Sequence, residues 1–185
     1  MSIVSWWSQR RGQLVRVTED EQEALPVSVR GPVTATGITR VVGPFEIPGQ
    51  VAAAYAAQDA IGTLFEIPNA TRDGIRTAIL HTAILYDPSD QGAAINIVLY
   101  DSKPVGTVAD NAAFGISDAD LLKVVGTLTF TTYQDYSGNQ AAVLSGLGMI
   151  ISTVGTSLYA QAVAVGTPTT AASSLLQVRF GFLQD

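Results

Sequence analysis

Two aspartates in a short acidic stretch are the first candidates for chemistry in this chain. Asp118 and Asp120 stand two positions apart, directly before an apolar run that begins at Leu121. Paired carboxylates can bind a metal ion or act as general acid and base, but either use needs further groups from elsewhere in the chain. Ser117 precedes Asp120 by three positions, which is the spacing of a helix cap, and acidic residues favour the positive end of a helix. The pattern therefore favours a helix start over an active site.

The single histidine, His81, lies in an alternating apolar segment, on the predicted strand face of Ile79 and Leu85. One histidine could serve a Ser-His-Asp triad, but no Gly-x-Ser-x-Gly elbow is present to position a nucleophile. We expect a hydrogen-bonded histidine, or one that contacts another subunit. No catalytic residue is predicted, and we expect no enzymatic activity; an enzyme would require Asp118, Asp120 and His81 to converge.

Composition argues against several other kinds of site. The chain has no cysteine, which excludes disulfides, thiolate catalysis and cysteine-ligated metals. The glycine-rich stretch at 146–151 begins like a dinucleotide loop but lacks the third glycine and the helix that such a loop needs. With ten basic and sixteen acidic residues, the chain has a net charge of -6, which does not favour the binding of a polyanion. We expect no metal, no cofactor and no nucleic-acid partner.

The chain has neither a predicted membrane span nor a signal-peptide pattern at its start. No segment reaches the roughly 20 apolar residues that a spanning helix needs. The first residues lack a basic region followed by an apolar core and a small-residue cleavage site. We therefore expect a soluble protein without a membrane partner.

An aromatic and basic cluster near the N-terminus is the predicted partner-binding site. Trp6 and Trp7 are followed closely by Arg10 and Arg11, and exposed aromatic and arginine side chains are enriched at interface hot spots. The apolar alternation of residues 1–36 is too brief to build a core, so we predict an extended N-terminal arm. A disordered terminus, or a tryptophan pair folded back onto the main domain, is the alternative.

The rest of the chain, 37–185, shows the period-2 alternation of an antiparallel β domain. Leu128 and Phe130 fall on one face of a predicted strand, and Thr127 and Thr129 fall on the other. Turn residues separate eight such segments, which are 40–47, 62–67, 74–86, 94–100, 126–132, 147–153, 157–165 and 175–183. The sequence predicts an all-β, antiparallel β-sandwich, jelly-roll-like, with about eight strands and one short helix near 117–124.

Four segments of the sequence resemble the small virion proteins with which tailed bacteriophages decorate or cement their capsids. They lie at 54–62, 97–104, 110–126 and 155–185. The resemblance implies a β-sandwich that assembles on the virion, often as a trimer, without enzymatic activity. The N-terminal arm is the part of the chain that is least like this pattern.

These observations lead to a functional expectation. We expect a phage virion structural protein that decorates and stabilises the outer surface of the capsid by binding the major capsid protein, as a homotrimer. It would be made in the host cytoplasm and would reside on the outer capsid surface. The part of the chain after Gly37 holds six basic and twelve acidic residues, which suits the outside because packaged DNA would repel it.

The alternative is a tail, fibre or vertex domain that binds glycans of the host surface. Tyr133, Tyr136 and Tyr159 could stack on a sugar ring. Packing of these tyrosines at strand ends is the interpretation that we favour, because half-buried tyrosine is ordinary in β domains.

Overall fold

The computed structural model describes residues 6–10, 13–17, 37–171 and 174–184. The chain divides into two units, 1–34 and 35–185, each of which is described by itself. In the first unit, β1 (Trp6–Arg10) and β2 (Gln13–Val17) pair antiparallel. The predicted arm, 1–36, therefore contains a two-stranded hairpin that the sequence analysis did not predict. Residues 18–36 of the arm lie outside the described part.

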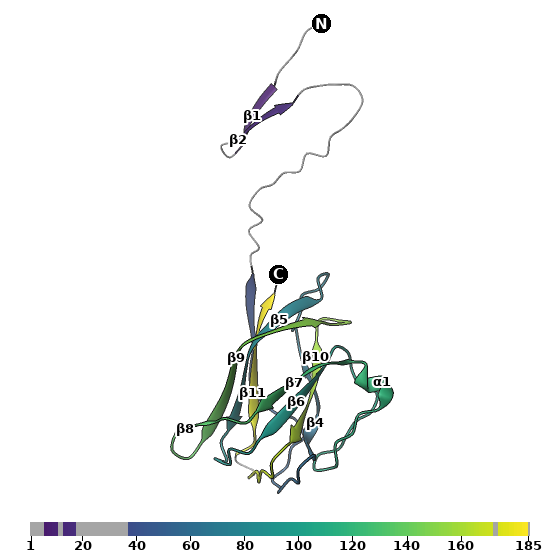
Figure 1. Cartoon of the computed structure of the whole chain (residues 1–185), viewed down its shortest axis with the longest axis vertical. Helices are drawn as coiled ribbons and strands as arrows, with labels where there is room; N and C mark the ends of the chain where they lie inside the picture. The colour runs from purple at the N-terminus through teal and green to yellow at the C-terminus, as the bar shows by residue number, and fades with distance from the viewer. Residues whose placement is uncertain (1–5, 11–12, 18–36, 172–173, 185) are drawn as a thin grey trace. The chain divides into compact units, whose positions relative to one another are not determined.

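The second unit is a sandwich of two antiparallel sheets (Figure 1). One sheet has the strand order β4-β10-β6-β7, and the other has the order β3-β11-β5-β9-β8. The elements are β3 (Ile38–Glu46), β4 (Ala60–Ile67), β5 (Thr77–Asp87), β6 (Ile95–Tyr100), α1 (Asp118–Leu121), β7 (Val124–Phe130), β8 (Gln134–Asp135), β9 (Gln140–Ser152), β10 (Leu158–Ala164) and β11 (Gln177–Gln184). The predicted all-β, antiparallel sandwich is confirmed.

The strands pair in a nested order that explains how the chain forms two sheets. β6 pairs with β7, β5 with β9, β4 with β10 and β3 with β11, all antiparallel. The chain is thus equivalent to one long hairpin, folded so that its paired strands alternate between the sheets. Further pairing of β10 with β6, and of β11 with β5, joins these pairs into the two sheets. This is the arrangement of a jelly roll.

All eight predicted strands are present, and apart from the start of β9 their ends lie within three residues of the predicted ones. β9 begins at Gln140, well before the predicted segment 147–153, and forms a short hairpin with β8, which was not predicted. The predicted helix near 117–124 is shorter than expected, because β7 already begins at Val124. In the described residues, no helix is long and apolar enough to cross a membrane.

The core lies between the sheets and follows the predicted alternation. Leu128 and Phe130 are buried, whereas Thr127 and Thr129 on the same strand are exposed. From the other sheet, the fully buried Phe180 packs against the rings of Phe45 and Phe182. The ring of Phe45 in turn contacts that of Phe65. The half-buried strand predicted at 126–132 is confirmed as β7, which begins two residues earlier and ends at Phe130.

β5 is irregular at His81 against both of its neighbours. Against β11, Leu80 pairs with Phe182 and Thr82 with Gly181, so His81 is an extra residue in β5 and the residues after it change face. Against β9, Leu80 pairs with Met149 and Thr82 with Ser145, so His81 stands opposite Gly146, Leu147 and Gly148. Both glycines have positive φ, +66° and +60°, a backbone conformation that side chains with a Cβ disfavour.

The bulge corrects one prediction about the histidine. Ile79 and Leu85 were expected to share a strand face with His81. Ile79 is exposed with His81 on the outside of the sheet, whereas Leu85 is fully buried in the core. The prediction was wrong for Leu85 because strict alternation does not continue through a bulge.

Replacing a core aromatic should test the packing of the two sheets. We expect Phe180→Ala to lower the free energy of unfolding by about 3–5 kcal/mol, because it removes a fully buried ring and leaves a cavity. Urea denaturation followed by circular dichroism measures the change. Thr129→Ala, on an exposed strand face, is the control and should change stability by less than about 0.5 kcal/mol. Equal losses for both variants would contradict the assigned core.

Candidate interaction site

The long connection 101–123, between β6 and β7, covers the outer face of the four-stranded sheet. Val98 and Tyr100 of β6 and Val163 of β10 form a second apolar cluster there, and Phe114 and Ile116 of the connection pack against it. β6 is therefore buried on both faces. Residues 111, 112 and 114 of the connection form hydrogen bonds with the backbone of Gln58 and Ala60, and a polar side chain anchors the stretch nearer to α1.

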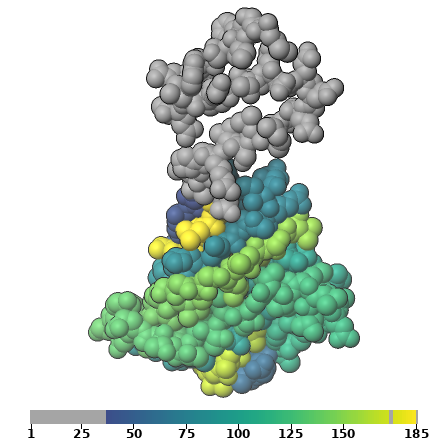
Figure 2. All heavy atoms as spheres, turned by 45° about the horizontal axis from the view of Figure 1, so that its top comes forward, coloured from purple at the N-terminus to yellow at the C-terminus, as the bar shows by residue number. Residues whose placement is uncertain are grey.

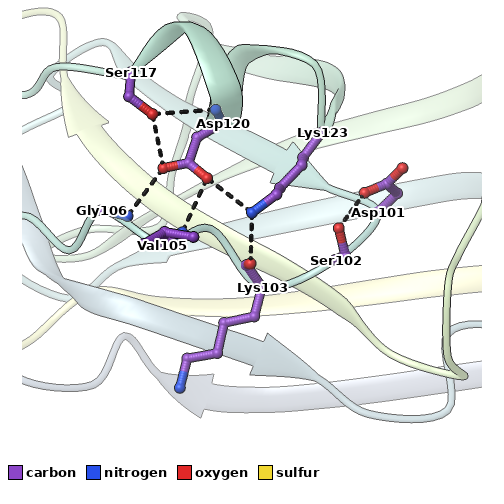
Figure 3. A network of polar contacts seen from close by, with 8 residues as sticks. All are labelled: Asp101, Ser102, Lys103, Val105, Gly106, Ser117, Asp120 and Lys123. Carbon is purple, nitrogen blue, oxygen red and sulfur yellow. Dashed lines mark hydrogen bonds and ion pairs between the residues drawn. The ribbon is translucent and has the colours of Figure 1, made fainter.

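The carboxylate of Asp120 is that anchor (Figure 3). One oxygen, Oδ1, accepts hydrogen bonds from the Val105 amide at 2.9 Å and from Lys123 Nζ at 2.9 Å. The other, Oδ2, accepts from the Gly106 amide at 2.9 Å and from Ser117 Oγ at 3.0 Å. The Asp120 side chain is buried, so each of these bonds satisfies a charge that would be costly to leave unpaired.

The predicted helix cap is confirmed within this network. Ser117 Oγ accepts a hydrogen bond from the Asp120 amide at 3.1 Å, and Ser117 has the extended backbone of an N-cap residue. Asp118 lies in the first turn, is exposed, and makes no side-chain hydrogen bond within the described part of the chain. The two aspartates therefore have different roles, and only Asp120 ties distant backbone segments together.

The same network makes Asp120 a poor general acid. The hydrogen bond from Lys123, and then those from the Gly106 and Val105 amides, hold the pKa of its carboxyl well below the usual range. The Asp120 charge in turn adds to burial, the larger cause, in raising the pKa of Tyr100 to about 12. Asp120 is consequently a fixed anion at neutral pH and does not exchange protons there.

His81 does not join the aspartates. It is exposed on β5 in the five-stranded sheet, whereas Asp118 and Asp120 lie outside the four-stranded sheet. The expectation of a hydrogen-bonded histidine is not met among the described residues, and contact with another subunit stays a prediction. Across those residues, no group of three or more acidic, histidine or cysteine side chains could hold a metal ion.

The structure leaves the predicted partner-binding cluster untested. Trp6, Trp7 and Arg10 lie in strand β1, and Arg11 lies outside the described residues. Their role in binding a partner stays a prediction from the sequence.

The three tyrosines considered for sugar stacking differ in environment. Tyr133 packs against the core and donates a hydrogen bond to the Ala93 carbonyl at 2.7 Å. Tyr159 packs against the outer cluster of the four-stranded sheet. The favoured interpretation, packing at strand ends, holds for these two, while Tyr136 in the turn between β8 and β9 is exposed.

Sequence reasoning missed an exposed aliphatic group beside the Asp120 network. Val105, Leu121 and Leu122 are 85%, 58% and 86% exposed, and we call these three residues the apolar tip. The Val105 amide is held by Asp120, and the two leucines follow Asp120 directly in the chain. The sequence did contain a signal for this group, because Leu121 and Leu122 are adjacent. Adjacent side chains of a one-turn helix point in different directions, so both cannot be buried against one surface.

A second aliphatic surface lies on the outside of the five-stranded sheet. Its members are exposed and come from four neighbouring strands; they are Val41, Ile79, Val143, Ile150 and Leu183, which we call the outer apolar face. Figure 2 shows the light-green band of β9 running beside β5 across this side of the domain. Large aliphatic residues gathered in this way on a surface are typical of sites that contact other proteins.

Comparison with known proteins does not assign a family or a function to this chain. A scan against protein-family models found no match, and a search of curated proteins found none of significance. The virion-protein resemblance therefore remains a prediction.

The Asp120 network predicts a pH-dependent stability. Because its folded-state pKa is depressed, Asp120 stabilises the fold fully above about pH 5, and this stabilisation is lost as the pH falls through the ordinary aspartate range toward the folded-state pKa. Asp120→Asn should lower the melting temperature at pH 7 and show a weaker decline below pH 5 than the wild type. Differential scanning calorimetry across this pH range measures both effects.

Asp118→Asn provides the matched control for this experiment. Its side chain is exposed and unbonded within the described residues, so the melting temperature should follow the wild type at every pH. Indistinguishable curves for the two variants would show that Asp120 does not anchor the connection.

Proposed function

We propose that this chain is a structural protein of a tailed-bacteriophage virion, which decorates and stabilises the outer surface of the capsid by binding the major capsid protein. The observation that carries the proposal is the pair of exposed aliphatic surfaces, the apolar tip on one sheet and the outer apolar face on the other. Exposed aliphatic residues that gather on one surface are typical of sites that contact other proteins. A component of an assembly needs surfaces through which it contacts its own copies and the capsid shell.

The chemistry of the described polar groups supports a mechanical role. The carboxylate of Asp120 is bound to backbone amides and a lysine, and that of Asp87, at the end of β5, accepts from the amides of Ser89, Gln91 and Gly92. These carboxylates position loops. Apolar area buried between copies, and between each copy and the shell, would contribute roughly 25 cal/mol per Å² before the costs of association.

Charge supports the outer surface as the location. The body of the chain after Gly37 has six basic and twelve acidic residues. A protein with this balance would be repelled by packaged DNA, and this repulsion is absent on the outside of a protein shell. Homotrimer formation follows from the resemblance and is part of the proposal.

A second candidate function is glycan binding by a tail, fibre or vertex domain. The exposed Tyr136 belongs to the β8–β9 hairpin. Next to this hairpin lies a hollow of about 220 Å³, lined by Tyr86, Pro88, Asn139, Gln140 and Gln177. An aromatic ring with neighbouring carboxamides offers the stacking and hydrogen bonding that a neutral sugar can use.

The copy number in purified virions separates these proposals. Decoration predicts a ratio to the major capsid protein near one, or near a simple fraction of it, by quantitative mass spectrometry. A handful of copies per particle, with saturable binding on a glycan array, would support the second candidate. Absence from the particle would overturn both.

The N-terminal cluster should contribute to binding of the shell. We expect the double variant Trp6→Ala, Trp7→Ala to raise the Kd for capsids that lack this protein by roughly tenfold or more, because aromatic hot spots often contribute over 1.4 kcal/mol. Co-sedimentation with such capsids measures the Kd. The double variant Ser8→Ala, Gln9→Ala in the same strand is the control. Equal affinity of both variants would remove the cluster from the binding site.

A further inference from the structure

Four polar side chains that line the hollow beside the β8–β9 hairpin have no hydrogen-bond partner among the described residues. They are the Tyr86 hydroxyl and the carboxamides of Asn139, Gln140 and Gln177. Asn139 is exposed, and the other three side chains are half-buried. Polar groups that converge on a hollow without partners of their own keep their hydrogen-bonding capacity for a ligand.

The register of the five-stranded sheet fixes where these groups lie. Gln177 of β11 pairs directly with Tyr86 of β5, and on its other side Tyr86 pairs with Ala141 of β9, which follows Gln140. The two flanking strands lie about 10 Å apart, because neighbouring strands are spaced by about 4.8 Å. The carboxamides therefore come from both strands that flank the tyrosine.

Neighbouring groups hold this lining in place before a ligand binds. The Arg179 guanidinium lies 5.7 Å from the centroid of the Tyr86 ring, within the range of a cation–π contact. Gln140 Oε1 packs against Gly92, where an added Cβ would come within 2.7 Å of it. The Gly92 amide in turn donates to the Asp87 carboxylate at 2.8 Å. A lining that is fixed in advance loses less conformational entropy on binding.

The chemistry of the lining favours a neutral ring that carries hydroxyl groups. None of the described residues that line the hollow is charged, and its volume of about 220 Å³ exceeds the roughly 150 Å³ cavity that accommodates benzene. Each carboxamide has both donors and an acceptor, which adjacent hydroxyl groups of a sugar can use together. An apolar ligand would leave these polar groups unpaired.

Charge argues against a nucleotide in the same place. A nucleobase could also contact an aromatic ring and carboxamides, but a chain of net charge -6 repels the phosphate that a nucleotide carries. For the same reason an acidic sugar is disfavoured, because the lining has no cation to pair with its carboxylate.

We propose that this hollow binds one neutral pyranose ring, which contacts the Tyr86 ring and forms hydrogen bonds with the carboxamides of Asn139, Gln140 and Gln177. The proposal deepens the second candidate function, glycan binding, on which it rests, by assigning the roles of these residues and excluding charged sugars. It does not depend on whether the chain decorates a capsid.

Saturation-transfer difference NMR with the full-length chain tests the site. The neutral probes are the methyl glycosides of glucose, galactose, mannose and N-acetylglucosamine at millimolar concentration, and the charged probes are methyl glucuronide and adenosine monophosphate. We expect saturation transfer to at least one neutral glycoside and none to the charged probes. Absence of transfer to every neutral probe would overturn the proposal, and so would equal transfer to methyl glucuronide.

Substitutions in the lining test the assigned residues with the glycoside that binds. Gln177→Ala should raise its Kd roughly fivefold, because one hydrogen bond to the sugar is lost. Tyr86→Ala should raise the Kd roughly tenfold or more, because the aromatic contact is lost. The Gln177 side chain is only half-buried, so Gln177→Ala keeps the test decisive if Tyr86→Ala does not fold.

Gln134→Ala is the matched control for Gln177→Ala. Gln134 lies in the neighbouring strand β8, is exposed and does not line the hollow, so the Kd should equal that of the wild type. A wild-type Kd in Gln177→Ala, measured on protein with an unchanged melting temperature, would remove the sugar from the hollow.

The site and the candidate functions can fail separately. If Tyr136→Ala abolishes binding while Tyr86→Ala and Gln177→Ala keep the wild-type Kd, glycan binding is retained and the hollow is not its site. Sugar binding in the hollow of a chain that is abundant on the shell keeps the site and removes the tail, fibre or vertex location. Absence of sugar binding overturns the site and leaves capsid decoration as it stands.

Discussion

The two sheets hold together because each long strand directs apolar side chains into the space between them. The chain has no cysteine, and the described residues offer no metal site, so this packing must stabilise the fold. Nested pairing of first strand with last, around the β6–β7 pair, makes the packing possible. It brings segments that are distant in sequence, such as β3 and β11, onto one sheet and places their buried faces against the other. The loops and surfaces of the second unit are positioned by this arrangement.

Carboxylates at the edges of the core also hold the connections between strands, because they accept hydrogen bonds from backbone amides there. Asp120 holds the connection between β6 and β7, and Asp87 accepts from three amides of the turn after β5. Asp110 accepts from the Tyr55 hydroxyl at 2.9 Å and from the Gly62 amide. Burial, followed by the bond to Asp110, raises the pKa of Tyr55 to about 12. Acidic residues that could be mistaken for catalytic groups thus replace missing backbone hydrogen bonds.

The core residues and the carboxylates thus serve the fold, so evidence about function must come from the surface of the molecule. The described acidic side chains that are buried have donors, and the remaining candidates are aliphatic residues that the fold leaves exposed. The apolar tip is held rigidly by Asp120, while the outer apolar face belongs to the sheet itself. Apolar surfaces on two sides of the domain are the features on which the proposed assembly role rests. This reading fits the virion resemblance without depending on any catalytic group.

The sequence by itself determined the fold class, the eight main strands and the helix cap, because these depend on neighbours along the chain. Alternation of Leu128 and Phe130 with threonines requires a half-buried strand, and Ser117 three positions before Asp120 caps a helix wherever that helix lies. The tertiary structure alone decided what covers each surface. His81 lies at a bulge because its neighbours Leu80 and Thr82 pair with consecutive residues of β11, and no local pattern in β5 predicts that register. Asp120 is an anchor because folding brings the amides of Val105 and Gly106 to its carboxylate. The periodicity of apolar residues along the chain does not predict such a contact.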